Sequence, residues 1–163
     1  MFESNAPLER IVGRTHDLQA TLTIDPSDLN SKISGTFTVD LTTLDTGLQL
    51  RNQHMRENHL ETGKYPDAVF KIIDVQTTGV TALTPETPVQ LTVTGDLTLH
   101  GVTQTYTVPG EITYWTVGDE QMLSGKAKWN INLQDHQVNR PRFLFTKLAE
   151  TQVASISFVL KTP

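Results

Sequence analysis

Histidines are the side chains of this chain whose chemistry best suits metal binding or proton transfer. The chain has five, at positions His16, His54, His59, His100 and His136. His54 with Asn58, and Met55 with His59, have the four-residue spacing of one helix face. The chain contains no HExxH sequence and no carboxylate placed as a base, so we expect no metal ion and no required cofactor. A metal- or haem-dependent enzyme that uses His54, His59, His100 and His136 is the alternative.

Nucleophilic catalysis has less support. The chain has no cysteine and no GxSxG sequence, and the run 134–142 contains Asp135 and His136 but no serine. Carboxylates do gather between residues 45 and 67, but Arg51, Arg56 and Lys64 balance them, which favours an ion-paired face over a catalytic pair. We therefore predict that the protein is not an enzyme.

One helix is expected in a chain that otherwise resembles strands. Thr46 and Gln49 have capping-box spacing, and Gly63 with Pro66 supplies a stop, which predicts a helix from about Gly47 to His59. Its polar side chains either bind the polar head of an apolar ligand or hold the helix on the strands, and the sequence leaves both readings open. The residues concerned are Arg51, His54 and Asn58, with Leu48 and Met55 beside them.

Composition limits the class of protein. The 163 residues suit a single domain over 1–163, and the net charge of −5 has no basic block, which disfavours nucleic acid as a partner. No apolar run approaches the roughly 20 residues that span a bilayer. We expect a periplasmic or secreted protein if a signal peptide has been removed, and a cytoplasmic one otherwise.

Alternation of apolar and polar residues predicts the strands. Such runs cover about 18–24, 33–41, 68–75, 91–99, 106–114, 127–133 and 154–160, with a short strand near Arg10. About eight antiparallel strands form either two packed sheets or a barrel. Gly35, Gly95, Gly110 and Gly125 have the inward parity, and either leave room for a ligand inside a barrel or act as kinks in a filled one. A filled barrel would be a structural or interaction module.

Several motifs together resemble the YceI-like family of lipocalin-like, polyisoprenoid-binding bacterial proteins. They are Asp45-Thr46-Gly47, Arg51, His54-Met55-Arg56, Leu60, Tyr65-Pro66, Phe70, Gly95-Asp96-Leu97-Thr98, Gly101-Val102-Thr103 and Arg140-Pro141. The resemblance implies a mainly β fold, an extended eight-stranded antiparallel barrel with one helix covering it, as a single lipid-binding domain.

It also implies a function. Members bind, store or transport a long-chain isoprenoid or similar amphiphilic lipid, such as an isoprenoid quinone, in an apolar tunnel. The expected partners are that lipid and, transiently, a membrane. A homodimer is possible. Inward parity selects the tunnel wall as Phe37, Val39, Phe70, Leu97, Leu99, Trp129, Ile131, Phe143 and Phe145, although alternation alone does not separate such a wall from a packed core.

Overall fold

The computed structural model describes residues 1–6, 9–140, 142–143 and 146–161. Its elements in chain order are β1 (Phe2–Ala6), β2 (Glu9–Gly13), β3 (Leu18–Thr23), β4 (Ser34–Asp40), η1 (Leu41–Thr43), α1 (Gln49–His54), η2 (Met55–His59), β5 (Asp67–Thr77), β6 (Val89–Leu99), β7 (Val102–Val117), β8 (Glu120–Asn132), η3 (Gln134–His136), β9 (Arg142–Phe143), β10 (Thr146–Lys147) and β11 (Thr151–Lys161). Strands dominate, as the alternation of apolar and polar residues predicts.

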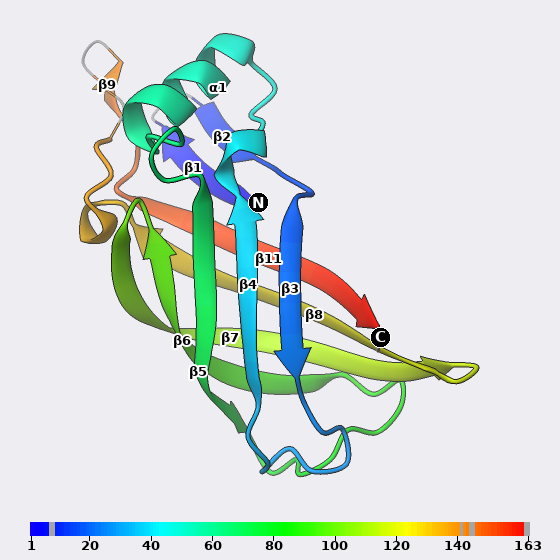
Figure 1. The fold of residues 1–163 in the computed structure, drawn as a ribbon. Coiled ribbons are helices and arrows are strands. Elements are labelled where there is room, and N and C mark those ends of the chain that lie inside the picture. Colours follow the sequence, from blue (N-terminus) through cyan, green and yellow to red (C-terminus); the bar gives the residue numbers. More distant parts are fainter. Residues whose placement is uncertain (7–8, 141, 144–145, 162–163) are drawn as a thin grey trace.

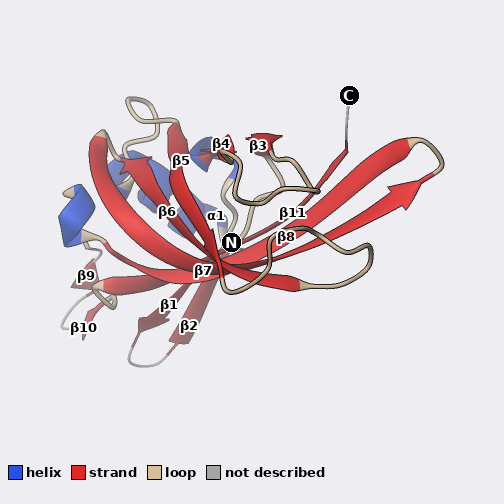
Figure 2. Cartoon of the chain, turned by 90° about the horizontal axis from the view of Figure 1, so that it is seen from below, coloured by secondary structure: helices blue, strands red, loops and turns tan. Residues whose placement is uncertain are grey.

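Nine strands form one antiparallel sheet in the order β2-β1-β11-β8-β7-β6-β5-β4-β3, and β9 pairs with β10 separately. The sheet curls, so that β3, β4 and β5 stand in front of β7, β8 and β11, with the helical segment at one end (Figure 1). The view from below shows the same curl and the long hairpin of β7 and β8 projecting to one side (Figure 2). The predicted fold class, a mainly β, barrel-like antiparallel sheet with one helix, is confirmed.

The strand count differs from the expected eight because the N-terminal region forms two strands. β1 pairs with β2 from Phe2 opposite Gly13 to Ala6 opposite Glu9, and β1 also joins β11. The sequence of β1, FESNA, has no regular alternation, so the pattern does not predict a strand there.

The two edges of the sheet, β2 and β3, are not hydrogen-bonded to each other in the part of the chain that is described. Side chains cover this seam instead. The rings of Phe37 on β4 and Phe158 on β11 lie 5.0 Å apart between centroids. Ala20 of β3 is the register partner of Phe37 and carries only a methyl group. The backbones of Arg14 and Asp45 also pair, which ties the end of the β2 segment to the loop before α1.

The end of the barrel far from the helix is packed with side chains. Its buried cluster consists of Leu29, Ile33, Leu83, Val89, Ile112 and Leu123. Leu29 and Leu83 come from loops that are joined by backbone hydrogen bonds, Leu29 N–H to Thr81 O and Leu83 N–H to Pro26 O. These loops close the lower end in Figure 1. A filled barrel is therefore realised at this end only.

The helix begins later than predicted. Gly47 has φ of 81°, which excludes it from a right-handed helix, so α1 starts at Gln49 after Leu48, and the turn up to His59 is π-helical. The predicted capping box is also wrong. Thr46 donates through its hydroxyl to Asn52 Oδ1 at 2.6 Å, and Leu48 makes no side-chain cap. No helix in the described residues is long and apolar enough to cross a membrane.

Two of the four inward glycines, Gly95 and Gly125, accommodate aromatic rings of neighbouring strands. A Cβ atom on Gly95 would overlap the Phe70 ring, and one on Gly125 would overlap the Phe158 ring. Gly125 lies directly opposite Phe158 in the β8–β11 register. Such rings over glycine stabilise sheet pairing. At these two positions a ring occupies the place of the missing side chain, so of the two alternatives the one in which the glycines leave room for a ligand does not hold there.

Candidate ligand cavity

A cavity of about 1830 Å³ opens between the inner face of the curled sheet and the segment formed by α1 and η2, and it extends past the sheet to side chains of the outer face. It stops above the packed cluster at the far end, because none of that cluster's buried residues lines it. Its lining also includes three side chains that have the outward parity of their strands: Gln90, Glu111 and Lys126. Glu111 accepts a hydrogen bond from Gln90 at 2.6 Å and forms an ion pair with Lys126 at 2.7 Å. The volume exceeds the roughly 300–1,000 Å³ of ordinary small-molecule pockets.

Strand alternation brings the predicted wall residues together. Phe37 and Val39 lie on β4, Phe70 on β5, Leu97 and Leu99 on β6, and Trp129 and Ile131 on β8, and all seven line the cavity. The rings of Phe70 and Trp129 are 6.2 Å apart between centroids. Phe145 and the side chain of Phe143 lie outside the described residues.

The five predicted helix residues, Leu48, Arg51, His54, Met55 and Asn58, also line the cavity. Arg51 is occupied by protein groups: Nε donates to Thr46 Oγ1 at 2.9 Å, Nη2 to Thr46 O at 2.9 Å and Nη1 to Glu9 at 2.6 Å. These bonds fasten α1 to its own N-terminal loop and to β2. For Arg51 the geometry therefore supports the structural alternative.

Buried Asn52 completes the support of this helix. Its Oδ1 accepts from the Thr46 N–H and hydroxyl, and its Nδ2 donates to Asp45 Oδ1 at 2.6 Å. The bonds from Gly47 N–H and Asn52 hold the pKa of the Asp45 carboxyl below its usual value. His54 and Asn58, by contrast, are exposed and have no hydrogen bond within the described residues. They are free to contact a polar group at the mouth.

Sequence reasoning missed a second wall. Ala154, Ile156, Phe158 and Leu160 of β11 line the cavity, as do Leu18 and Ala20 of β3 and Phe2 of β1. The alternation in β3 and β11 is visible in the sequence. The sequence does not show that β3 and β11 lie near each other in the fold. That proximity places their inward side chains around the same cavity as the predicted wall.

His59, His100 and His136 contact backbone carbonyls of the protein itself. His136 is fully buried, with Nδ1 3.0 Å from Val102 O and Nε2 2.9 Å from the Tyr106 hydroxyl. Burial lowers the pKa of His136 and raises that of Tyr106. His136 is therefore neutral, donating from Nδ1 to Val102 and accepting at Nε2 from Tyr106.

His59 and His100 also bind carbonyls. His59 Nδ1 lies 2.8 Å from Asn139 O, and His100 lies 3.2 Å from His136 O and 2.6 Å from Glu61 Oε2. Burial lowers the pKa of His59. Among the described residues no three histidine, aspartate or glutamate side chains are grouped to hold a metal ion.

A curled antiparallel sheet, packed at one end and hollow beneath a helix at the other, defines a protein that can enclose an apolar molecule. The YceI-like domain model matches residues 3–160, and the chain belongs to this family. The resemblance seen in the sequence motifs is thereby confirmed.

Similar proteins agree with this assignment. A UPF0312 protein of Vibrio parahaemolyticus is 35% identical over 103 residues, and Protein YceI of Escherichia coli O157:H7 is 32% identical over 104 residues. These matches cover 62% and 63% of this chain, and the chain spans about half (49%) of the length of either relative.

Among solved structures, a polyisoprenoid-binding domain from Saccharophagus degradans matches with a TM-score of 0.74 and 17% identity, covering 99% of this chain and 92% of that one. The YceI protein of Campylobacter jejuni matches with a TM-score of 0.75 and 18% identity, covering 94% and 85%. At such identities these likenesses establish the fold.

Proposed function

We propose that this protein binds a long-chain isoprenoid or similar amphiphilic lipid and stores or carries it. The observation that supports this most directly is the cavity of about 1830 Å³ with an aromatic and aliphatic inner wall. The family assignment and the likeness to a polyisoprenoid-binding domain point the same way. An isoprenoid quinone is one candidate ligand.

The free energy of burying the lipid tail favours reversible binding over permanent retention. Burying apolar chain is worth roughly 0.8 kcal/mol per CH₂ group, so a tail on the order of 40 carbons could exceed the limit of non-covalent affinity if water were the only alternative. A membrane solvates the same tail equally well. The affinity of the cavity relative to a membrane is therefore modest, which allows uptake and release.

Exchange with a membrane would take place at the helical end. Leu48 and Leu50, at the start of α1, are 56% and 66% exposed and both line the cavity. Exposed leucines at the rim of an apolar cavity give the tail a continuous apolar path from the bilayer. Uptake, enclosure and release break no covalent bond, so this function needs neither a catalytic residue nor a cofactor.

Organic extraction of the purified protein, followed by mass spectrometry, tests the proposal. We expect a long-chain lipid in near-stoichiometric amount. Replacing Ala154 in the cavity wall with phenylalanine should reduce the lipid per folded protein. The same replacement at exposed Ala82, which is outside the cavity, should leave it unchanged. Protein from a lipid-rich host that repeatedly yields no lipid would refute the proposal.

A further inference from the structure

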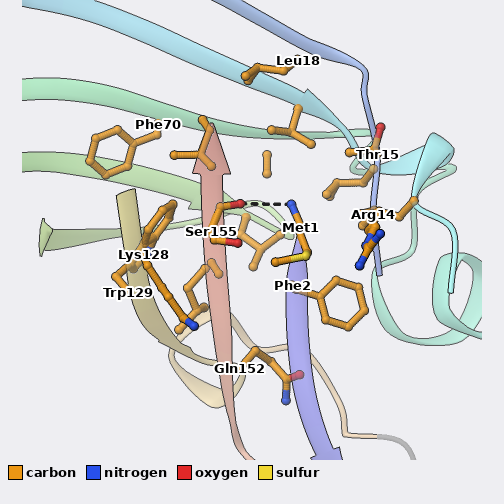
Figure 3. A pocket seen from close by; sticks show the side chains of 18 of the residues that line it. Met1, Phe2, Arg14, Thr15, Leu18, Phe70, Lys128, Trp129, Gln152 and Ser155 are labelled. Carbon is orange, nitrogen blue, oxygen red and sulfur yellow. Dashed lines mark hydrogen bonds between the residues drawn. The ribbon is translucent and has the colours of Figure 1, made fainter. Parts of the chain in front are cut away.

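One edge of β11 is covered along only part of its length. β1 pairs with it from Glu3, which lies opposite Val153. Met1 is the last covering residue: the Ser155 N–H donates to Met1 O at 2.9 Å, and the Met1 ammonium donates to Ser155 O at 3.1 Å (Figure 3). β11 runs on to Lys161, and in the described part of the chain no strand pairs with residues 156–161 on the side away from β8. This stretch is called the free edge below.

The backbone groups of the free edge have a defined direction. Because Met1 and Ser155 form a hydrogen-bonded pair, alternation along β11 points the N–H and C=O of Ser157 and Val159 to the same side. Neither residue has a backbone partner on that side among the residues that the structure describes. The sequence of the free edge, ISFVLK, has no proline and a single charge, and Val159 is 59% exposed. Unprotected edges of this kind are templates for pairing with another strand.

β3, the other strand that borders the seam, runs in a compatible direction. Antiparallel pairings lead from β11 through β8, β7, β6, β5 and β4 to β3, so β11 and β3 point the same way. Direct pairing of the two would be parallel, in a sheet whose described pairs are all antiparallel. One added strand that is antiparallel to β11 is also antiparallel to β3.

The hydrogen-bonding parity of β3 suits the same added strand. The Asp40 N–H donates to Asp17 O, so by alternation Ala20 and Leu22 point their backbone groups away from β4. The side chains of these two residues face inward, whereas the β11 residues with free backbone groups carry outward side chains. A single strand directs its bonds alternately to its two sides, so its outward residues would bond to β11 and its inward residues would face β3.

These groups select a lone polypeptide segment as the occupant. Backbone N–H and C=O groups pair with another backbone, which a lipid tail does not provide. A second copy would bring a whole sheet, because every described strand of the nine-stranded sheet is bonded to at least one neighbour. The rings of Phe37 and Phe158 already meet across the seam, 5.0 Å apart between centroids, so the segment needs a small side chain opposite Phe158.

We propose that the free edge binds an extended segment of a partner protein, which adds to β11 as one more antiparallel strand. The segment alternates small or apolar side chains, which face inward, with polar side chains, which face outward. Main-chain hydrogen bonds to Ser157 and Val159 provide the affinity, and the inward side chains beside Ile156 and Leu160 provide the selectivity. The proposal does not depend on which lipid the cavity takes.

A dye-labelled peptide, Glu-Val-Thr-Ala-Thr-Val, tests the proposal, with its alanine designed to lie opposite Phe158. Fluorescence anisotropy measures binding, and hydrogen exchange followed by NMR measures the protection of the Ser157 and Val159 amides. We expect saturable binding that slows the exchange of both amides. Methylation of the two threonine nitrogens, which would donate to the free edge, keeps the side chains and should weaken binding at least tenfold.

Variants of the free edge provide a matched pair. Val159→Pro removes one N–H of the edge and should weaken peptide binding about three- to tenfold, whereas Val159→Thr keeps the N–H and should bind like the wild type. Proline is tolerated on an edge strand whose N–H faces solvent, and circular dichroism verifies the fold. In a second arm, the same six residues are added before Met1, which raises their effective concentration beside the edge.

Other occupants give distinct results. If neither the free peptide nor the tethered segment protects the two amides, the proposal is overturned. Protection by the tethered segment alone would assign the edge to the protein's own chain, and concentration-dependent protection with a dimer mass and no peptide would assign it to a second copy. Either result overturns a partner protein, as does binding that survives both N-methylation and Val159→Pro.

Discussion

Gly125→Ala provides a sharp test of how the barrel wall is packed. The added Cβ would overlap the Phe158 ring, whose atoms are the three nearest neighbours of that position. The ring cannot simply turn inward, because it already packs against Phe37 at 5.0 Å. Overpacking a rigid position costs about 1–3 kcal/mol of unfolding free energy. For a chain of this size a loss of about 2 kcal/mol lowers Tm by roughly 4–8 °C.

A double-mutant cycle isolates the cause. Phe158→Leu alone removes part of a ring and destabilises the protein, but it also clears the space that the methyl group added at position 125 needs. The double variant should therefore be more stable than the sum of the two single changes predicts, by about 1 kcal/mol or more. Urea unfolding of the four proteins measures this coupling.

Gly63→Ala is the matched control, since a Cβ there has no neighbour within 4 Å. Its stability should stay within about 0.5 kcal/mol of the wild type. If Gly125→Ala were as stable as the wild type, or if the two changes were additive, the ring-over-glycine arrangement would be refuted.

Three further predictions concern the helical cover and its surroundings. Arg51→Met removes three hydrogen bonds to Thr46 and Glu9 and should expose amides of α1 to faster hydrogen exchange, with the lipid content per folded protein unchanged; protection equal to wild type would contradict its structural role. Because burial lowers the pKa of His136 below its usual value of 6.5, its contribution to stability is present above pH 6.5 and is lost as pH falls towards the folded pKa. Urea midpoints between pH 5 and 8 should therefore fall less steeply in His136→Gln, and an identical slope would argue against this. Leu50→Ser should slow lipid transfer to vesicles, measured by fluorescence dequenching, without changing Tm; an unchanged rate would remove the apolar rim from the exchange route.

Alternation in the sequence predicts the strands well and the cavity only in part. Val89 and Leu99 belong to the same strand, β6, and have the same inward parity. Val89 packs into the cluster at the closed end, whereas Leu99 lines the cavity at the helical end. The period of two says which face a residue occupies, but the depth at which the barrel changes from filled to hollow depends on loops such as the one that carries Leu83.

The start of the helix shows a second limit of prediction from the sequence. Thr46 and Gln49 have capping-box spacing, but the left-handed backbone of Gly47 moves the start of α1 and gives Thr46 another acceptor, Asn52. Likewise, nothing in the sequence pairs Arg51 with Glu9, which lies 42 residues away. Local patterns do not encode such contacts, because they depend on where distant strands meet.

In the described part of the chain, the seam between the two edges of the sheet is not closed by hydrogen bonds between paired strands. In a fully hydrogen-bonded barrel, a wider ligand would have to break a ladder of backbone bonds. Here the Phe37–Phe158 contact is a link across the gap, and an aromatic pair contributes only about 0.5–1.5 kcal/mol beyond the area it buries. Separating the two rings would leave the backbone ladders on either side intact, so opening the seam would cost less free energy than separating two hydrogen-bonded strands.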